Sequence, residues 1–429
     1  MPRLAFDKHT LKLQWVYQQP EIAAPMTSRP TVRFLDRKTP PTIFTLILLA
    51  GISALSMNIF LPSLPNMTAH FDTEYRLMQL SVALYLGVNA LLQVIVGPIS
   101  DFLGRRPVIL GSMALFCLFT LGCIIAPTVE IFLAFRMAQA VVVAGMVLSR
   151  AIVRDMVPQE EAASMIGYVT MGMSIIPMIG PAIGGVLDTA FGWQANFWLL
   201  LLCGLFVLWL TFTDLAETST AKDAGFRRQF SEYPELLSSP RFWGYSLAAA
   251  FSSGSFFAYL GGTPFVGSDV FGLSPAVLGV YFGAPAIGYL AGNYCSGRFS
   301  VRFGINRMIL WGTLFTAFGM GLSLVLFSAG LGSALVFFGF MTFVGIGNGL
   351  VLPNATSGML SVRPHIAGTA SGLGGAIMIG GGAALSALAG ALLSPGSGAL
   401  PLLWIMFATS VMAVACTLYV MRRSQQVIA

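Results

Sequence analysis

The residues best suited to chemistry lie in one short polar stretch, Gly97-Pro98-Ile99-Ser100-Asp101-Phe102-Leu103-Gly104-Arg105-Arg106-Pro107. Asp101 can pair with either arginine, and the arginines can also bind anionic lipid headgroups. Gly97 and Gly104 permit a tight turn with close packing. This is the chemistry of ion pairs rather than of bond making, since the sequence has no phosphate-binding Walker loop and no catalytic-triad spacing. We therefore expect neither an enzyme nor an ATP-driven pump, and no cofactor or metal ion.

The elements that position this stretch are two apolar runs, residues 77–96 before it and 108–126 after it. A membrane-spanning helix needs about 20 apolar residues, because the hydrocarbon core is about 30 Å thick. The sequence thus predicts a hairpin of two spanning helices with a tight, positively charged loop. Such loops belong on the cytoplasmic side of a membrane.

The composition agrees with a chain that faces lipid. Of 429 residues, 56% are hydrophobic and only 9% are charged, whereas a soluble domain has roughly 25% charged residues. The apolar runs are long and continuous, which favours helices over the alternating strands of a β-barrel. The net charge of +6 does not indicate nucleic-acid binding, because the basic residues stand singly in loops between the apolar runs.

Twelve spans are predicted, in two groups of six separated by the polar residues 216–240. We expect a cytoplasmic tail at 1–42, a six-helix bundle at 43–215, a cytoplasmic linker at 216–240, a second bundle at 241–421 and a tail at 422–429. Met26 is an alternative start to Met1, and the sequence leaves that choice open. The predicted spans are 43–63, 77–97, 107–126, 130–152, 162–187, 195–215, 241–262, 275–296, 307–329, 333–355, 367–392 and 398–421.

The positions of Lys and Arg predict the orientation. With both termini in the cytoplasm, 21 of the 23 Lys and Arg residues fall on the cytoplasmic side, and Arg76 and Arg136 remain near the other face. Such a bias sets topology. An offset of 200 residues also aligns the two groups of spans, with Gly97 on Gly297 and Gly104 on Gly304. Parallel repeats of this kind suggest two bundles around a central cavity.

Several motifs together resemble one known family. The stretch 97–107 resembles the loop signature of the major facilitator superfamily, and Arg136-Met137-Ala138-Gln139-Ala140 resembles its buried-arginine motif. Gly172 followed by Gly180-Pro181-Ala182-Ile183-Gly184-Gly185 is similar to the fifth-helix motif of its antiporters. Leu61-Pro62-Ser63-Leu64-Pro65 and Ser149-Arg150-Ala151-Ile152-Val153-Arg154-Asp155 narrow the resemblance to the twelve-helix drug/proton antiporters of the bicyclomycin/chloramphenicol resistance (Bcr/CflA) branch.

The resemblance implies an all-α integral membrane protein of two six-helix bundles, in which the loop 97–107 latches the halves together on the cytoplasmic side when the outside is open. It also implies a bacterial inner-membrane protein, monomeric, that exchanges a small-molecule substrate for protons. The residues it assigns to gating or coupling are Gly97, Asp101, Gly104, Arg105, Arg106, Arg154 and Asp155.

The residues themselves suggest how a cavity is lined. Ser81, Tyr85, Asn89 and Gln93 recur at four-residue spacing and form a polar stripe on the second span, which should face the protein interior. Arg136 is a cation inside a span, where an unpaired charge is costly, so it should also face inward unless it snorkels to the outer surface. The predicted cavity residues are Asn58, Tyr85, Asn89, Arg136, Gln139, Tyr259 and Asn348.

The acids raise one difficulty for proton coupling. None of the 17 Asp and Glu residues lies in the middle of a predicted span, and Asn58 stands where the branch usually carries an aspartate. Either Asp101, Asp155 or Glu130 carries the proton, or coupling is weaker or different. We expect an exporter of hydrophobic or amphiphilic drugs, with two alternatives: a transporter of one specific metabolite, or a membrane receptor that does not transport.

Overall fold

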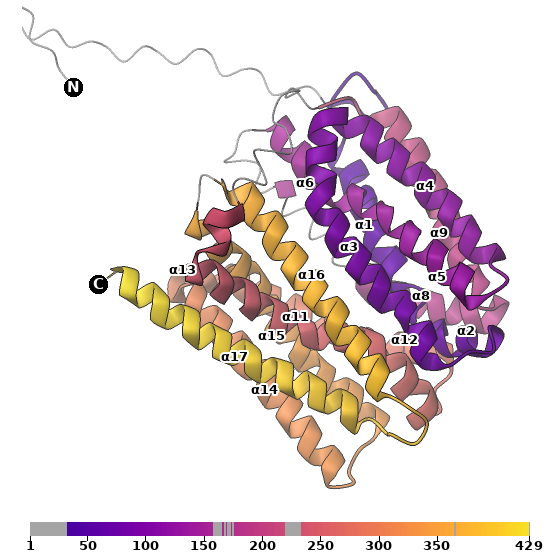
Figure 1. Ribbon diagram of the computed structural model, residues 1–429, viewed down its shortest axis with the longest axis vertical. Helices are drawn as coiled ribbons and strands as arrows, with labels where there is room; N and C mark the ends of the chain where they lie inside the picture. The colour runs from indigo at the N-terminus through magenta and orange to yellow at the C-terminus, as the bar shows by residue number, and fades with distance from the viewer. Residues whose placement is uncertain are drawn as a thin grey trace, which may run out of the picture. The chain divides into compact units, whose positions relative to one another are not determined.

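Long α-helices make up the structure, several of them 26 to 29 residues long. The computed structural model describes residues 32–157, 165–166, 169, 173, 176–218, 233–363 and 366–428, and these residues form no strand. The elements are α1 (Ile43–Asn58), η1 (Leu61–Ser63), α2 (Leu64–His70), α3 (Tyr75–Leu103), α4 (Arg105–Ile125), α5 (Val129–Ala138), η2 (Gln139–Val142), α6 (Val143–Met156), α8 (Ile176–Phe191), α9 (Gln194–Asp214), α11 (Pro240–Phe265), η3 (Val266–Val270), α12 (Pro275–Tyr281), α13 (Ala284–Phe303), α14 (Ile305–Ser328), α15 (Ala334–Val362), α16 (Ala367–Leu392) and α17 (Leu400–Ile428) (Figure 1).

Ten helical segments of the described chain are long and apolar enough to cross a membrane. The predicted spans 162–187 and 241–262 are the other two. The first overlaps α8, and the residues before α8 lie largely outside the described part of the chain; the second lies within α11, whose serines and glycines lower its hydropathy. The prediction of an all-α integral membrane protein is confirmed.

Two glycines mark equivalent helix junctions in the two halves of the chain. Gly104 separates α3 from α4 with φ 97°, and Gly304 separates α13 from α14 with φ 81°. Each glycine N–H donates to the carbonyl of a serine four residues earlier, Ser100 or Ser300, at 2.9 Å. A side chain would be strained at such positive φ values, so the 200-residue repeat has a conformational basis at this point.

The start of the first span is fixed by Asp214, the last residue of α9. Its carboxylate is completely buried and accepts hydrogen bonds from the backbone N–H groups of Leu35 (2.7 Å) and Thr42 (3.0 Å). The hydroxyl groups of Thr42 (3.1 Å) and Thr45 (2.6 Å) donate to the same carboxylate. Asp214 thus joins the first turn of α1 to the end of α9, where it satisfies donors that a helix start leaves free.

Replacing Asp214 with alanine is expected to destabilise the protein by about 3 kcal/mol or more, because hydrogen bonds to a charged group contribute roughly 1.5–3 kcal/mol each and buried donors would be left unpaired. The check is the thermal unfolding midpoint of detergent-solubilised protein. Asp269→Ala, at an exposed carboxylate in η3, is the matched control. An Asp214→Ala midpoint equal to that of Asp269→Ala would contradict the assignment.

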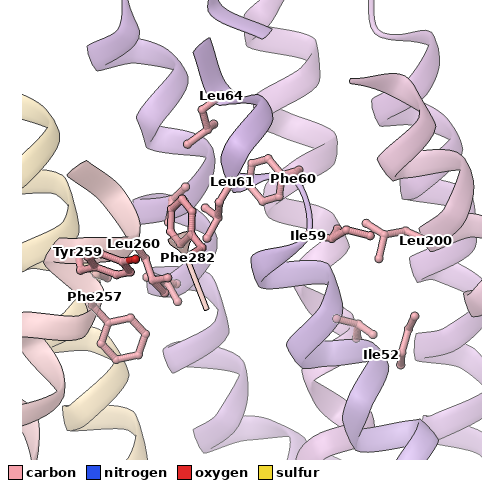
Figure 2. Packing of buried hydrophobic residues seen from close by; sticks show 14 of the residues in the cluster. Ile52, Ile59, Phe60, Leu61, Leu64, Leu200, Phe257, Tyr259, Leu260 and Phe282 are labelled. Carbon is pink, nitrogen blue, oxygen red and sulfur yellow. The ribbon is translucent and has the colours of Figure 1, made fainter. Parts of the chain in front are cut away.

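Contacts between the two halves of the chain involve few helices. α3 packs along α16, and α8 packs against α12 (Figure 1). We call "outer" the helix ends that the Lys and Arg distribution predicts to face the cell exterior, and "inner" the opposite ends. One cluster of buried apolar side chains runs from η1 in the first half to the outer part of α11 and Phe282 in the second half (Figure 2). A separate cluster, including Phe242, Tyr245 and Ile309, fills the inner part of the second half alone.

Candidate functional site

Arg136 is a fully buried charged residue at the centre of the candidate site. Its side chain, on α5, is 0% exposed. Nη1 donates to the Ser56 hydroxyl at 3.1 Å and to the Gln139 side-chain carbonyl, and Nη2 donates to the Ser56 backbone carbonyl at 2.8 Å. The guanidinium lies over the Tyr85 ring at 3.9 Å and over the Phe60 ring at 4.4 Å. Arg136 therefore points into the protein and does not snorkel.

The positive charge of Arg136 is held without a negative partner. Among the described residues it makes no ion pair, and its Nε has no hydrogen-bond partner. Two aromatic faces and carbonyl oxygens stabilise it instead, since a desolvated cation over a ring gains about 2 kcal/mol. A second layer holds the acceptors in place: the Gln139 amide donates to Thr120 at 2.7 Å, and the Tyr85 hydroxyl donates to Ser56 at 3.3 Å.

The other predicted cavity residues are buried but do not all join this cluster. Asn58 is 1% exposed; its amide donates to the Ala54 carbonyl at 2.7 Å, and its side-chain oxygen has no partner among the described residues. Asn89 accepts a hydrogen bond from Gln93 at 2.8 Å. Ser81, Tyr85 and Asn89 are at most 5% exposed, so this part of the polar stripe on α3 faces inward as predicted. In the second half, Tyr259 lies in an aromatic cluster and Asn348 accepts from Ser252 at 2.9 Å.

The structure thus brings Tyr85, Arg136 and Gln139 into direct contact around Ser56. It places Tyr259 and Asn348 elsewhere, on α11 and α15 of the second half. Tyr259 stacks on Phe256, with ring centroids 6.2 Å apart, and its hydroxyl has no partner in the described chain. That these groups share one cargo cavity stays a prediction.

The loop signature forms an ion-pair cluster at the inner end of the first half. Arg105 pairs with Asp101 at 2.5 Å and with Asp155 at 3.2 Å, so the predicted pairing of Asp101 with an arginine is confirmed. Arg106 instead donates to the Phe212 carbonyl at 3.1 Å and lies over that ring. Arg154 is exposed, on α6 beside Asp155.

The partners of Arg105 and Arg106 in the described chain all belong to α3, α4, α6 and the residues around the end of α9. The Glu217 carboxylate accepts from the backbone N–H groups of Arg105 (2.9 Å) and Arg106 (3.2 Å), and so caps the start of α4. A carboxylate at a helix N-terminus is favoured by the helix dipole. In this conformation the cluster joins elements of one half; the latch between halves was predicted for the outward-open state and stays a prediction.

The fifth-helix motif packs α8 against both α1 and the second half. Gly180 and Gly184 face α1, and a Cβ atom at Gly184 would overlap the Ile59 carbonyl oxygen. Gly185 faces α12, where a Cβ would overlap the Pro275 carbonyl oxygen. Small residues permit helices in membranes to approach this closely. Gly172 lies outside the described residues.

The contact of α8 with α12 is reciprocal. A Cβ atom at Gly279 of α12 would overlap the carbonyl oxygen of Pro181 in α8, just as Gly185 requires space beside Pro275. We call these four residues the outer seam, because they lie at the outer ends of their helices. The seam is a backbone-to-backbone contact that only glycine permits on each side.

Two polar side chains of α3 reinforce closure at the outer end. The Gln79 amide donates to the Ser386 carbonyl at 2.6 Å and to its hydroxyl at 3.0 Å, and Gln79 is 1% exposed. The Tyr75 hydroxyl donates to the Gly261 carbonyl at 2.9 Å. Within the described residues, these are the hydrogen bonds that join the two halves. Sequence reasoning missed both, because nothing near Tyr75 or Gln79 in the chain marks a partner so far away.

One acid of the site was also passed over. Asp188 on α8 is 5% exposed; its carboxylate accepts from the Asn66 amide at 2.9 Å, and the Ser63 hydroxyl is a second neighbouring donor. Gly180, Gly184 and Asp188 recur at four-residue spacing and therefore share one helix face. That spacing is the signal that could have identified Asp188 as part of the motif.

Comparisons with known proteins agree with the motifs. Residues 46–387 match the family model described as the Major Facilitator Superfamily. The chain is 32% identical over 383 residues to an uncharacterized MFS-type transporter of Bacillus subtilis, covering 86% of this chain and 92% of the relative. It is 27% identical over 371 residues to multidrug resistance protein D of Escherichia coli, covering 84% and 91%. It is 29% identical over 333 residues to a chloramphenicol resistance protein of Pseudomonas aeruginosa, covering 76% and 79%.

A solved structure supports the fold. A D-xylose-proton symporter superposes with a TM-score of 0.68 at 16% identity, over 88% of this chain and 96% of that chain. At this identity the likeness concerns the fold alone. The chain therefore belongs to the major facilitator superfamily of membrane transporters, and the bicyclomycin/chloramphenicol resistance branch predicted from its motifs is confirmed by the relatives that it matches.

Proposed function

We propose that this protein exports hydrophobic or amphiphilic drugs across the bacterial cytoplasmic membrane by alternating access, in exchange for protons. The names of two relatives, a multidrug resistance protein and a chloramphenicol resistance protein, support the substrate class. The observation that carries the mechanism is the outer seam, where Gly185 and Gly279 admit the carbonyls of the opposite half. An alternating-access transporter that is closed by so short a contact in one state must break this contact in the other state.

The two moving bodies in this proposal are residues 43–215 and 241–421. Closed outer contacts through α8 and α12, together with a separate inner core in the second half, fit a state open to the cytoplasm. In this proposal the tail 1–42, the linker 216–240 and the tail 422–429 lie in the cytoplasm, which the distribution of Lys and Arg supports. The protein acts as a monomer in this proposal, with the lipid bilayer, a small-molecule substrate and protons as its partners.

The test is transport into inverted membrane vesicles with and without an imposed pH gradient, across a panel that includes chloramphenicol. Vesicles containing the protein should accumulate several members of the panel faster than vesicles without it, and the pH gradient should increase the rate. Accumulation at the control rate for every compound would refute export. A saturable profile for one compound alone would favour the single-metabolite transporter.

For the proton, we propose that Asp188 provides the uptake site on the outside. Asp101 and Asp155 share Arg105 as an ionic partner, whereas Asp188 has only neutral neighbouring donors, the Asn66 amide and the Ser63 hydroxyl, and no ion pair in the described chain. A carboxylate enclosed in this way is favoured in its neutral form, because burial penalises the charge. The outer seam would therefore close only after the Asp188 carboxylate has taken up a proton from outside.

Asp188→Asn is expected to abolish the response of efflux to a pH gradient, because asparagine cannot take up a proton, while downhill exchange of substrate continues. The measurement compares gradient-driven uptake with substrate exchange in the same proteoliposomes. Asp269→Asn, at an exposed outer carboxylate, is the control. A pH-gradient response equal to wild type in Asp188→Asn would place proton uptake elsewhere.

A further inference from the structure

Residues 32–39, immediately before the first span, form a compact turn, which we call the anchor turn. The Thr39 N–H donates to the Asp36 carbonyl at 3.0 Å, and the Arg33 N–H donates to the Thr39 hydroxyl at 3.2 Å. The Lys38 N–H donates to the Asp36 carboxylate at 3.0 Å. These hydrogen bonds fix the path of the backbone, so the exposed side chains of the turn have a defined arrangement.

Asp214 holds the anchor turn in place. Its buried carboxylate accepts from the Leu35 N–H at 2.7 Å and, just after the turn, from the Thr42 N–H at 3.0 Å. Leu35 has φ 60°, a left-handed conformation that is strained for a bulky residue. The hydrogen bond to Asp214 holds Leu35 in this conformation, in which its side chain is exposed. A strained backbone that presents an exposed apolar side chain suggests a function for this side chain.

The apolar side chains of the anchor turn lie beside a lipid-facing residue of α1. The Phe34 ring packs edge-on against the Phe44 ring, with the centroids 6.4 Å apart. Phe44 is in the first turn of α1 and is exposed, and since α1 begins a span, this ring faces lipid. Phe34 is 56% exposed and Leu35 is 42% exposed. Apolar side chains of this size are stabilised when the edge of a bilayer removes them from water.

Three cations accompany these apolar groups. The side chains of Arg33, Arg37 and Lys38 are exposed and make no ion pair with any residue that the structure describes. Asp36, the one acid of the anchor turn, is half-buried and binds the Lys38 backbone N–H. Basic and apolar side chains that stand together next to a span are the pattern that binds anionic membrane surfaces.

We propose that the anchor turn is a binding site for anionic phospholipids in the leaflet at the inner end of α1. Phe34 and Leu35 enter the boundary between headgroups and acyl chains, while the three basic side chains contact the lipid phosphates. Opposite charges attract strongly at such a surface, because the anionic leaflet concentrates cations within a short distance of its headgroups. The surface lies outside the candidate site, so the inference does not depend on the export function.

The test measures how well acrylamide, a neutral quencher dissolved in water, reaches the anchor turn. The exposed Val32 is replaced in Val32→Cys, which keeps every side chain assigned to lipid contact, and the cysteine is labelled with a fluorophore. The full-length protein is placed in nanodiscs of phosphatidylcholine, alone or mixed with phosphatidylglycerol, and labelled wild-type protein gives the background from the native cysteines. We expect at least about threefold weaker quenching in the mixture. Equal quenching in the two lipid compositions overturns the proposal.

Charge variants assign the effect to the anchor turn. The combined variant Arg33→Gln, Arg37→Gln and Lys38→Gln should bring quenching in the mixture to within about 1.5-fold of that in phosphatidylcholine. The matched control makes the same charge change at three exposed arginines around the junction of α13 and α14, namely Arg298, Arg302 and Arg307. The control should keep the protection. Protection that survives in the anchor-turn variant, or that disappears in the control, overturns the assignment of the site.

Two further variants test the apolar contact and the preceding chain. Phe34→Ser removes the larger apolar side chain and should weaken the protection at least about twofold. Unchanged protection in Phe34→Ser would contradict the entry of this ring into the bilayer. A chain that begins at Met26 retains the whole anchor turn and should be protected as well as the chain that begins at Met1. Loss of protection in the shorter chain would assign the lipid contact to residues 1–25 and overturn the proposal.

Discussion

Replacing Arg136 with methionine is expected to lower active efflux by tenfold or more, to near the rate of membranes without the protein. Methionine is similar in length and apolar, but it removes the charge and every donor. The Ser56 carbonyl and the Gln139 side-chain carbonyl would then lose their partner in a fully buried site. The measurement is drug accumulation in inverted vesicles, normalised to the amount of monodisperse protein.

The expected loss reflects the charge itself, because Arg136 has no ionic partner in the described chain that its removal would leave unpaired. Arg136→Lys separates charge from geometry. Lysine keeps the cation, but its ammonium cannot lie flat between the Tyr85 and Phe60 rings while reaching both Ser56 and Gln139. We expect intermediate efflux from Arg136→Lys. The distant control is Arg302→Gln, which removes an exposed arginine of α13 and should leave efflux at the wild-type rate. Wild-type efflux from folded Arg136→Met would remove Arg136 from the transport mechanism.

Gly185→Val is expected to hold the outer seam open and to reduce efflux tenfold or more. A valine side chain would collide with the Pro275 backbone carbonyl, and neither backbone can give way as a flexible side chain would. Each half would still fold, but the two halves would stay apart at the seam and the protein would favour the outward-open state. The second measurement is therefore accessibility: Ser63→Cys, at a position now 0% exposed, should become reactive toward an impermeant maleimide added from outside.

The matched control is Gly111→Val on α4, where no atom lies within 4 Å of the position that a Cβ would occupy. It introduces the same β-branched residue into a membrane helix without a clash. We expect normal efflux and no labelling of Ser63→Cys in that background. Normal efflux with an unlabelled Ser63→Cys in Gly185→Val would show that the seam does not have to separate during transport.

Local features of the sequence identified much of the site. The four-residue spacing of polar residues on the second span correctly predicted that this stripe faces inward, because a helix brings such residues onto one face. That Asp101 can pair with one of the two arginines was also expected from the loop residues, and the structure shows that this partner is Arg105, just beyond the Gly104 junction. In both cases the partners lie within about one turn of each other along the chain.

Contacts between distant segments could not be found in this way. Gln79 binds Ser386, 307 residues later, and Asp214 binds Leu35, 179 residues earlier. Glu217, at the start of the predicted linker, caps a helix that begins at Arg105. No periodicity or composition marks such pairs, because their proximity depends on how whole helices pack.

The sequence by itself determined that this chain is a helical membrane protein, and the resemblance of its motifs to a known family implied a transporter with an arginine inside its fourth span. Length, hydropathy and charge placement suffice for the spanning helices, since the bilayer restricts spanning segments to a few solutions. Only the tertiary structure decided that this arginine lies against two aromatic rings with no ion pair among the described residues, and that the outer seam is closed by backbone contacts. These depend on close packing between helices, which is set by side-chain shapes at positions that the chain brings together only when folded.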